Sequence, residues 1–146
     1  MKKTVYLFGY LRKDCPFDLE WRKHAHDAFV AAECRVLDPA RGHAEKLCDP
    51  VEVCDLFAPH ELFHRDRQDI LKADILFGVI QPRPQDRPPV GSLVELGMAH
   101  EMPGQRLVCL VSQDPDITEH PFVKETTTMI FSDLYHALDF VRANWL

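Results

Sequence analysis

Short, uninterrupted apolar runs that alternate with longer amphipathic segments are the feature that most constrains how this chain can fold. The clearest run follows Asp74, where residues 75–80 read ILFGVI. Side chains of a strand point alternately to the two faces of its sheet, so a strand that is apolar throughout has both faces covered. Helices that connect parallel strands supply such cover.

The same alternation extends along the whole chain. Strands are expected at residues 4–8, 34–37, 74–80, 106–112 and 128–131. Helices with an apolar side are expected at residues 18–32 and 60–72. Further helices are expected at residues 92–102, where Pro103 and Gly104 stop the helix, and from a cap at Ser132 or Asp133 to about Asn144. This order predicts an α/β domain with a doubly wound, flavodoxin-like or Rossmann-like sheet of five mostly parallel strands and helices on both faces. We expect one domain over residues 1–146.

Composition narrows the classes of function. The formal net charge of −6 disfavours a surface for a nucleic acid polymer, which needs clustered Lys and Arg. No window approaches the roughly 20 apolar residues of a membrane span. The five cysteines form no CxxC pair and have no zinc spacing, which is typical of reduced thiols. We therefore expect a cytoplasmic protein with a small-molecule ligand.

The fold class directs attention to three loops. In doubly wound sheets, ligands bind beyond the carboxyl ends of the strands, where the strand order reverses. The loops at residues 9–17, 81–90 and 112–118 follow such ends, and the second holds four prolines, which exclude a helix or central strand. Residues 41–59 form the least regular stretch and are expected to be loop.

Glu95 lies in the stretch GSLVELG at residues 91–97. Ser92 and Glu95 have the spacing of a capping box, in which the serine caps a helix and the glutamate bonds back to it. A carboxylate in the first helical turn is also kept ionised by the helix dipole, and an ionised carboxylate suits attack on an anomeric carbon. Gly91 would then free the preceding loop. The spacing alone supports both the cap and the nucleophile.

Asp66 is the second candidate carboxylate. Arg65 and Arg67 flank it and favour its charged form, which accepts hydrogen bonds from sugar hydroxyls or a base amine. Asp66 and Asp69 share one side of a helix, so a solvated acidic face is the alternative.

Aromatic and basic residues mark the end of the first strand. Tyr6 lies within the strand and suits either the core or a ligand contact. Tyr10 and Arg12 follow Gly9 in the loop, where they suit stacking on a base and binding of a phosphate.

Cofactor and metal motifs are either missing or out of context. The first loop has no G-x-G-x-x-G pattern and the chain has no Walker motif, so no dinucleotide or other cofactor is expected. Residues 60–64 read HELFH, the H-E-x-x-H pattern of zinc proteases. A parallel α/β setting without a distal third ligand disfavours zinc, so no metal is expected.

Four short stretches follow one another along the chain in a specific order and spacing: VYLFG at 5–9, RDRQDILKADIL at 65–76, GSLVELGMA at 91–99 and LVCL at 107–110. Together they resemble the nucleoside 2-deoxyribosyltransferase family, which also includes nucleotide N-glycosidases. The resemblance implies that Glu95 attacks C1′ of a 2′-deoxynucleoside and that another base, or water in the hydrolases, captures the covalent deoxyribosyl-enzyme. It implies that Asp66 lies beside the base and sugar and that Tyr6 orients Glu95. The expected substrate-binding residues are Gly9, Tyr10, Arg12, Arg65, Asp86, Gly91, Ser92 and Met98.

Two positions depart from the family pattern. Transferases commonly carry an acid two residues before the motif glycine, where this chain has Pro89, and Asp86 is the nearest acid in the same loop. Transferases also often place an Asn of a neighbouring subunit on the sugar, whereas this chain has HPF at residues 120–122. The resemblance further implies a homo-oligomer whose sites are completed across an interface. Phe122 or Trp145 suits such an interface, and packing in the core is the alternative for both.

Three functions remain open from the sequence. The leading one is transfer of deoxyribose between bases, with a free nucleoside and a nucleobase as partners. The second is hydrolysis of a nucleoside 5′-monophosphate, in which Arg12, Lys13 and Arg65 would hold the phosphate. The third is a non-catalytic nucleotide-binding module in which Glu95 only caps its helix.

Overall fold

The computed structural model describes residues 1–12, 15–40, 59–81 and 88–146. Five strands form one sheet in the order β2-β1-β3-β4-β5, and every pairing between neighbours is parallel. The strands are β1 (Thr4–Gly9), β2 (Arg35–Leu37), β3 (Ile75–Val79), β4 (Leu107–Val111) and β5 (Met129–Phe131). The predicted fold class and the five predicted strands are confirmed.

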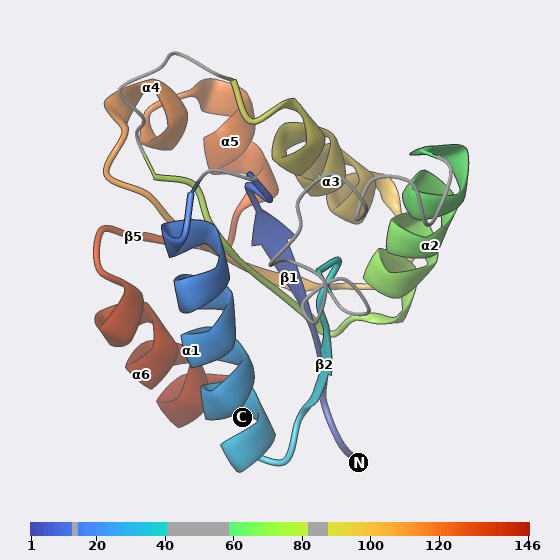
Figure 1. Ribbon diagram of the computed structural model, residues 1–146, viewed down its shortest axis with the longest axis vertical. Coiled ribbons are helices and arrows are strands. Elements are labelled where there is room, and N and C mark those ends of the chain that lie inside the picture. Colours follow the sequence, from blue (N-terminus) through green and yellow to red (C-terminus); the bar gives the residue numbers. More distant parts are fainter. Residues whose placement is uncertain (13–14, 41–58, 82–87) are drawn as a thin grey trace.

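Helices cover the two faces of the sheet in separate groups (Figure 1). On one face, α1 (Phe17–Ala31) and α6 (Leu134–Asn144) pack on the alternate strand residues that include Val5, Leu7 and Phe77. The opposite face, which includes Tyr6, Phe8 and Leu76, is covered by the remaining helices. They are α2 (Pro59–Lys72), α3 (Val90–Glu101), α4 (Pro115–Thr118) and α5 (Pro121–Thr126). The apolar period of two in the strands therefore fills two cores at once.

The strand order reverses between β1 and β3. The chain passes from β1 outward to β2 and then returns to add β3 on the other side of β1. Tyr6 of β1 pairs with Leu37 on one side and Leu76 on the other, so it stands in the strand beside this switch point. The switch point of a doubly wound sheet is where ligands bind, so the carboxyl ends of β1 and β3 are the first place to look for chemistry.

Gly9 ends β1 in a conformation that no larger residue would fit. Its φ is +145°, and a Cβ there would lie 2.5 Å from the carbonyl oxygen of Val79 and 3.0 Å from the ring of Trp21. The end of β1 thus lies directly against the end of β3 and the first turns of α1.

The structure differs from the expected elements at two places. Helix α3 begins at Val90, two residues before the expected start, because Pro89 occupies the N-cap position. The short helices α4 and α5 were not predicted, since four and six residues are too few to show a helical apolar period. Their signal is instead local: Asp114 and His120 each cap a helix whose first residue is proline.

The expected loop at residues 41–58 and most of the loop before α3 lie outside the described residues. In the described part of the chain, no helix has both the length and the apolar character needed to cross a membrane.

Candidate active site

Glu95 lies in the second turn of α3, which packs over β1. The capping-box interpretation is wrong, because the helix begins at Val90 without a side-chain cap and Ser92 is buried within its first turn. Glu95 therefore does not cap the N-terminus of α3. Its position in the helix directs it toward Tyr6 of β1, and these two side chains form the centre of the candidate site.

The Tyr6 hydroxyl and one carboxyl oxygen of Glu95, Oε2, are shut off from solvent, although Glu95 as a whole is only half-buried. Within the described part of the chain, neither the Tyr6 hydroxyl nor Glu95 Oε2 has a hydrogen-bond partner of normal geometry. The hydroxyl is nevertheless close enough to the carboxyl to favour its ionised form. A buried carboxyl oxygen without a partner is costly, and such groups are concentrated where a ligand or a reaction uses them.

Burial raises the pKa of Glu95 from 4.5 to about 7, and the negative charge of Asp66 acts in the same direction. The hydroxyl of Tyr6 and the positive charge of Arg22 oppose this rise. The expectation that the helix dipole keeps Glu95 ionised at neutral pH is thus wrong, because desolvation outweighs the dipole beyond the first turn. Burial and the carboxylates of Glu95 and Asp66 also raise the pKa of Tyr6, so Tyr6 remains a protonated hydroxyl.

Asp66 stands on α2, which packs against both β1 and α3. Its carboxylate accepts hydrogen bonds from the Nε and Nη2 atoms of Arg65 at 3.1 and 3.0 Å. Arg65 also donates to the carbonyl oxygen of Pro39 at 2.8 Å, which ties α2 to the segment after β2. Asp66 and Arg65 are half-buried rather than solvated, so the expected side of the helix faces the site.

Arg22 of α1 is a charged residue of this region that no sequence motif indicated. It is 2% exposed, and its guanidinium donates to Asp38 at 2.6 Å and to the carbonyl oxygen of Gly9 at 2.9 Å. A signal was present in the sequence, because Arg22 lies three and seven residues before Ala25 and Phe29 on the apolar side of its helix. A cation at an apolar helical position has a buried partner or a function.

Two solved structures have a fold similar to that of this chain. One is a 2-deoxyribosyltransferase from the psychrotolerant bacterium Bacillus psychrosaccharolyticus, with a TM-score of 0.65, 19% identity, and coverage of 93% of this chain and 90% of that chain. The other is the 2-deoxyribosyltransferase from Leishmania mexicana, with a TM-score of 0.72, 13% identity and coverage of 99% of both chains. This chain has the fold of the 2-deoxyribosyltransferases. The sequence matches no protein-family model and no curated protein.

The chain spans nearly the full length of both 2-deoxyribosyltransferases, so the switch point and the helix that carries Glu95 belong to the shared fold. The structure brings Tyr6, Asp66 and Glu95 together, as the resemblance to that family implied. Their catalytic roles remain a proposal.

The loop after β1 is organised around a second buried arginine. Arg12 forms a forked ion pair with Asp18, with distances of 2.7 Å from both Nε and Nη2, and its guanidinium lies 3.9 Å from the centre of the Tyr10 ring. Arg12 thus has an acidic partner within the protein, and one face of Tyr10 is already covered. Close packing on Val79 and Trp21 explains why a glycine stands at position 9.

The other expected substrate-binding residues have varied surroundings. Gly91 is in α3 rather than in the preceding loop, and Met98 packs against the core that contains Tyr6. Asp86, the expected neighbour of the departing base, lies outside the described residues.

The HELFH stretch falls in the first turns of α2, where the rings of His60 and His64 lie 4.4 Å apart. Over the described ranges, no three His, Cys, Asp or Glu side chains come together in a way that would hold a metal ion.

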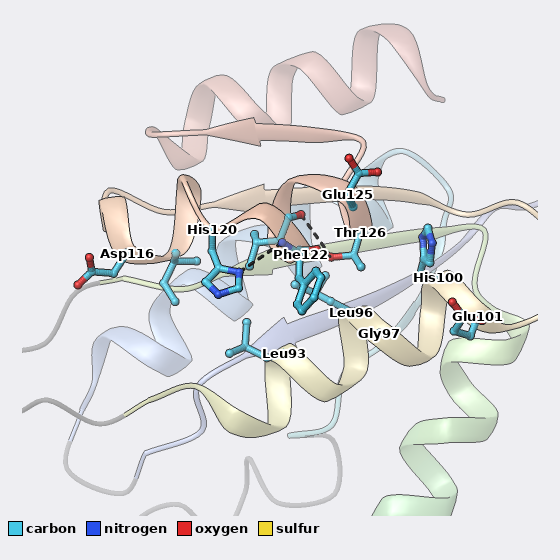
Figure 2. Close-up of a pocket in the computed structure, with 12 residues that line it drawn as sticks. Leu93, Leu96, Gly97, His100, Glu101, Asp116, His120, Phe122, Glu125 and Thr126 are labelled. Carbon is cyan, nitrogen blue, oxygen red and sulfur yellow. Dashed lines mark hydrogen bonds between the residues drawn. The ribbon is translucent and has the colours of Figure 1, made fainter.

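A groove of about 610 Å³ lies between α3 and the α4–α5 pair (Figure 2). Its apolar side chains are Leu93, Leu96, Ile117, Phe122 and Val123. Figure 2 shows Glu101, Asp116 and Glu125 toward its edges. Phe122 is 77% exposed, so a large aromatic side chain stands open to solvent beside this groove. The groove does not include Glu95 and is a separate surface from the candidate active site.

Proposed function

We propose that this protein is a nucleoside 2-deoxyribosyltransferase in which Glu95 is the nucleophile. The observation that carries the proposal is the buried carboxyl of Glu95, with one oxygen unpartnered, facing the Tyr6 hydroxyl beside the switch point of the sheet. The shared fold with two 2-deoxyribosyltransferases supports the same activity. A carboxylate with a pKa of about 7 is more basic than an exposed one, which makes it a better nucleophile once it is ionised.

The reaction proceeds in two displacements at C1′. A carboxylate oxygen of Glu95 forms a bond to C1′ while the bond from C1′ to the base nitrogen breaks, and the base keeps the electron pair and takes up a proton. A second base then attacks C1′ through its own nitrogen, the bond to Glu95 breaks, and that base loses a proton. Both steps develop positive charge on the sugar, which the adjacent carboxylate stabilises.

Tyr6 and Asp66 have supporting roles in this proposal. The Tyr6 hydroxyl remains protonated, so it donates toward Glu95 and holds the carboxylate in one orientation. Asp66 accepts hydrogen bonds from the sugar or the base while Arg65 fixes its position. Tyr10, Ser92 and Met98 remain proposed contacts of the substrate.

The charge distribution favours a nucleoside over a nucleoside 5′-monophosphate. The buried and half-buried arginines of this region, Arg12, Arg22 and Arg65, are each paired with an aspartate. A phosphate would have to share or displace these carboxylates, whereas a neutral nucleoside needs no such rearrangement. Hydrolysis of monophosphates by the same Glu95 is therefore the second candidate.

Base exchange is expected when the protein is incubated with deoxyinosine and adenine. New deoxyadenosine and free hypoxanthine should form in equal amounts, measured by chromatography. A parallel incubation with deoxynucleoside monophosphates and no acceptor base tests the hydrolase. If free base forms only in the second incubation, the protein is a hydrolase of monophosphates and not a transferase. Binding of nucleosides without any product would leave only the binding module.

We also propose a homo-oligomer that uses the groove beside Phe122. The apolar side chains of Val90, Leu93 and Val94 are exposed on α3, and Phe122 is exposed on α5 next to them. Such an aromatic anchor beside an apolar groove is typical of the centre of a protein interface. A second copy seated there would lie against the same helix that carries Glu95.

Replacing Phe122 by Glu is expected to shift the protein toward a smaller assembly, because it adds a charge to an apolar contact that already has acidic edges. The measurement is the mass in solution by light scattering over a range of concentrations. Tyr135→Glu is the matched control, since Tyr135 is exposed on α6, on the opposite face of the sheet. A monomeric wild type, or equal masses for wild type and Phe122→Glu, would contradict the interface.

A further inference from the structure

Arg22 joins the ends of two strands from the far side of the sheet. Its helix, α1, covers the face opposite to α3, yet its guanidinium reaches the carboxyl edge. Nη2 donates to the carbonyl oxygen of Gly9, the last residue of β1, and Nη1 donates to Asp38, the first residue after β2. Gly9 itself is held against Val79 and Trp21. Arg22 is thus a bridge between the ends of β1 and β2.

The guanidinium of Arg22 is a buried cation with one unused donor. Arg22 is 2% exposed, and its Nε is a buried donor without a partner among the described residues. Asp38 is shared with the backbone N–H of Ala40, which donates to the same oxygen at 2.9 Å. One side of the guanidinium lies 4.7 Å from the ring of Trp21. A buried charge of this kind acts on other charges over a long range, because little solvent screens it.

The positive charge of Arg22 lies at the carboxyl edge of the sheet and favours the ionised form of Glu95. Tyr6 from β1, Asp66 from α2 and Arg22 from α1 are the described groups whose charge or hydrogen bonding acts on Glu95. Asp66 disfavours the ionised carboxylate, so Arg22 is the one full positive charge in this described set. Arg22 also acts on Tyr6 in the direction opposite to that of Glu95 and Asp66.

We propose that Arg22 is a positioning residue of the active site, which fixes the carboxyl ends of β1 and β2 through its hydrogen bonds to Gly9 and Asp38 and holds a buried positive charge at this edge of the sheet. It acts through Gly9, Asp38 and Glu95 and does not need to touch the substrate. Only the expected effect on base exchange rests on the proposed function. Its electrostatic part concerns the free protein.

Two substitutions separate the bridge from the charge. Arg22→Met keeps a long apolar stem but removes both the hydrogen bonds and the charge. Arg22→Lys keeps the charge, but a single ammonium group lacks the fork that reaches Gly9 and Asp38 together. Each protein carries ¹³C-labelled glutamate, and the titration of the Glu95 carboxyl is followed by NMR, with Glu95→Gln used to assign the signal. The same proteins are assayed for base exchange across pH.

Arg22→Met is expected to raise the midpoint of the Glu95 titration by about one pH unit, because the carboxylate loses a favourable charge. Its kcat/KM at pH 6 should fall about tenfold as a result. Arg22→Lys should leave the midpoint unchanged and lower kcat by about tenfold, since the strand ends are no longer fixed.

Arg106→Met is the matched control. Arg106 also donates to backbone carbonyl oxygens, among them those of Ile70 and Leu71 at 2.8 Å each, but it lies before β4 at the other end of the sheet. The Arg106→Met variant should be less stable than the wild type, but the midpoint of its Glu95 titration should be unchanged. If Arg22→Met also leaves the titration in place, Arg22 is only structural and the proposal is overturned. If the titration moves but no variant and no wild type exchanges bases, the proposed function fails while the electrostatic role of Arg22 stands.

Discussion

Replacing Glu95 by Gln is expected to lower kcat for base exchange by at least about a thousandfold. The amide has the same shape as the carboxyl but is a far poorer nucleophile, so the covalent step has no efficient substitute. Nucleoside affinity should change by no more than about threefold, because the amide occupies the same volume as the carboxyl. The measurements are single-turnover exchange and equilibrium binding of deoxyinosine.

A covalent adduct provides the direct observation. Wild-type protein mixed with a deoxynucleoside and then denatured should carry the mass of one deoxyribosyl group on the peptide that contains Glu95. Glu95→Gln should carry none. Glu20→Gln is the matched control, since Glu20 is an exposed glutamate of α1. Full exchange by Glu95→Gln would show that Glu95 is not the nucleophile, and an adduct on another residue would identify its replacement.

The fold followed from the sequence because its strands are buried on both faces. The run at β3 is apolar at every position, and the structure places it at the centre of the sheet with β1 and β4 on either side. Amphipathic periodicity likewise predicted α1 and α2, and a capping residue predicted α6. The elements that the sequence did not predict, α4 and α5, are stabilised by local caps and too short to have a periodic apolar face.

The candidate site was only partly predictable, because burial of a helical residue depends on packing between segments far apart in the sequence. The order of the motifs brought Glu95, Asp66 and Tyr6 together correctly. The sequence did not predict that Glu95 leaves the first turn of its helix and becomes buried between α3 and β1, which reverses the expected effect on its pKa. Arg22 was missed because its partners, Gly9 and Asp38, are 13 and 16 residues away.

Activity is expected to fall, and the contribution of Glu95 to stability to rise, as the pH decreases from 8 to 5. The nucleophile is the ionised form of Glu95, and its pKa is about 7 in the free protein. Below that pH, kcat/KM should therefore fall about tenfold per unit, since it reports ionisation of the free enzyme. A pH profile of base exchange at subsaturating deoxynucleoside measures this limb. A flat profile between pH 5 and 7 would contradict a nucleophile with this pKa.

The sign of the stability change is opposite because the native state binds the proton more tightly than the unfolded chain. The pKa of Glu95 is about 7 in the folded protein against 4.5 as its ordinary value. Between these values the native state carries more protons, so the free energy of unfolding falls as the pH rises through this window. The protonated carboxyl contributes at most about 3 kcal/mol, all of it present below pH 4.5 and lost above about pH 7.

Urea unfolding of wild type and Glu95→Gln at pH 5, 6, 7 and 8 isolates this contribution, because all other groups titrate alike in the two proteins. The amide cannot ionise, so the variant should gain stability relative to wild type as the pH rises. If the difference in the free energy of unfolding between the two proteins stays constant with pH, folding does not raise the pKa of Glu95. The proton that stabilises the fold also blocks the nucleophile. The pH near 7 above which the stability difference levels off should therefore also be the midpoint of the acid limb of kcat/KM.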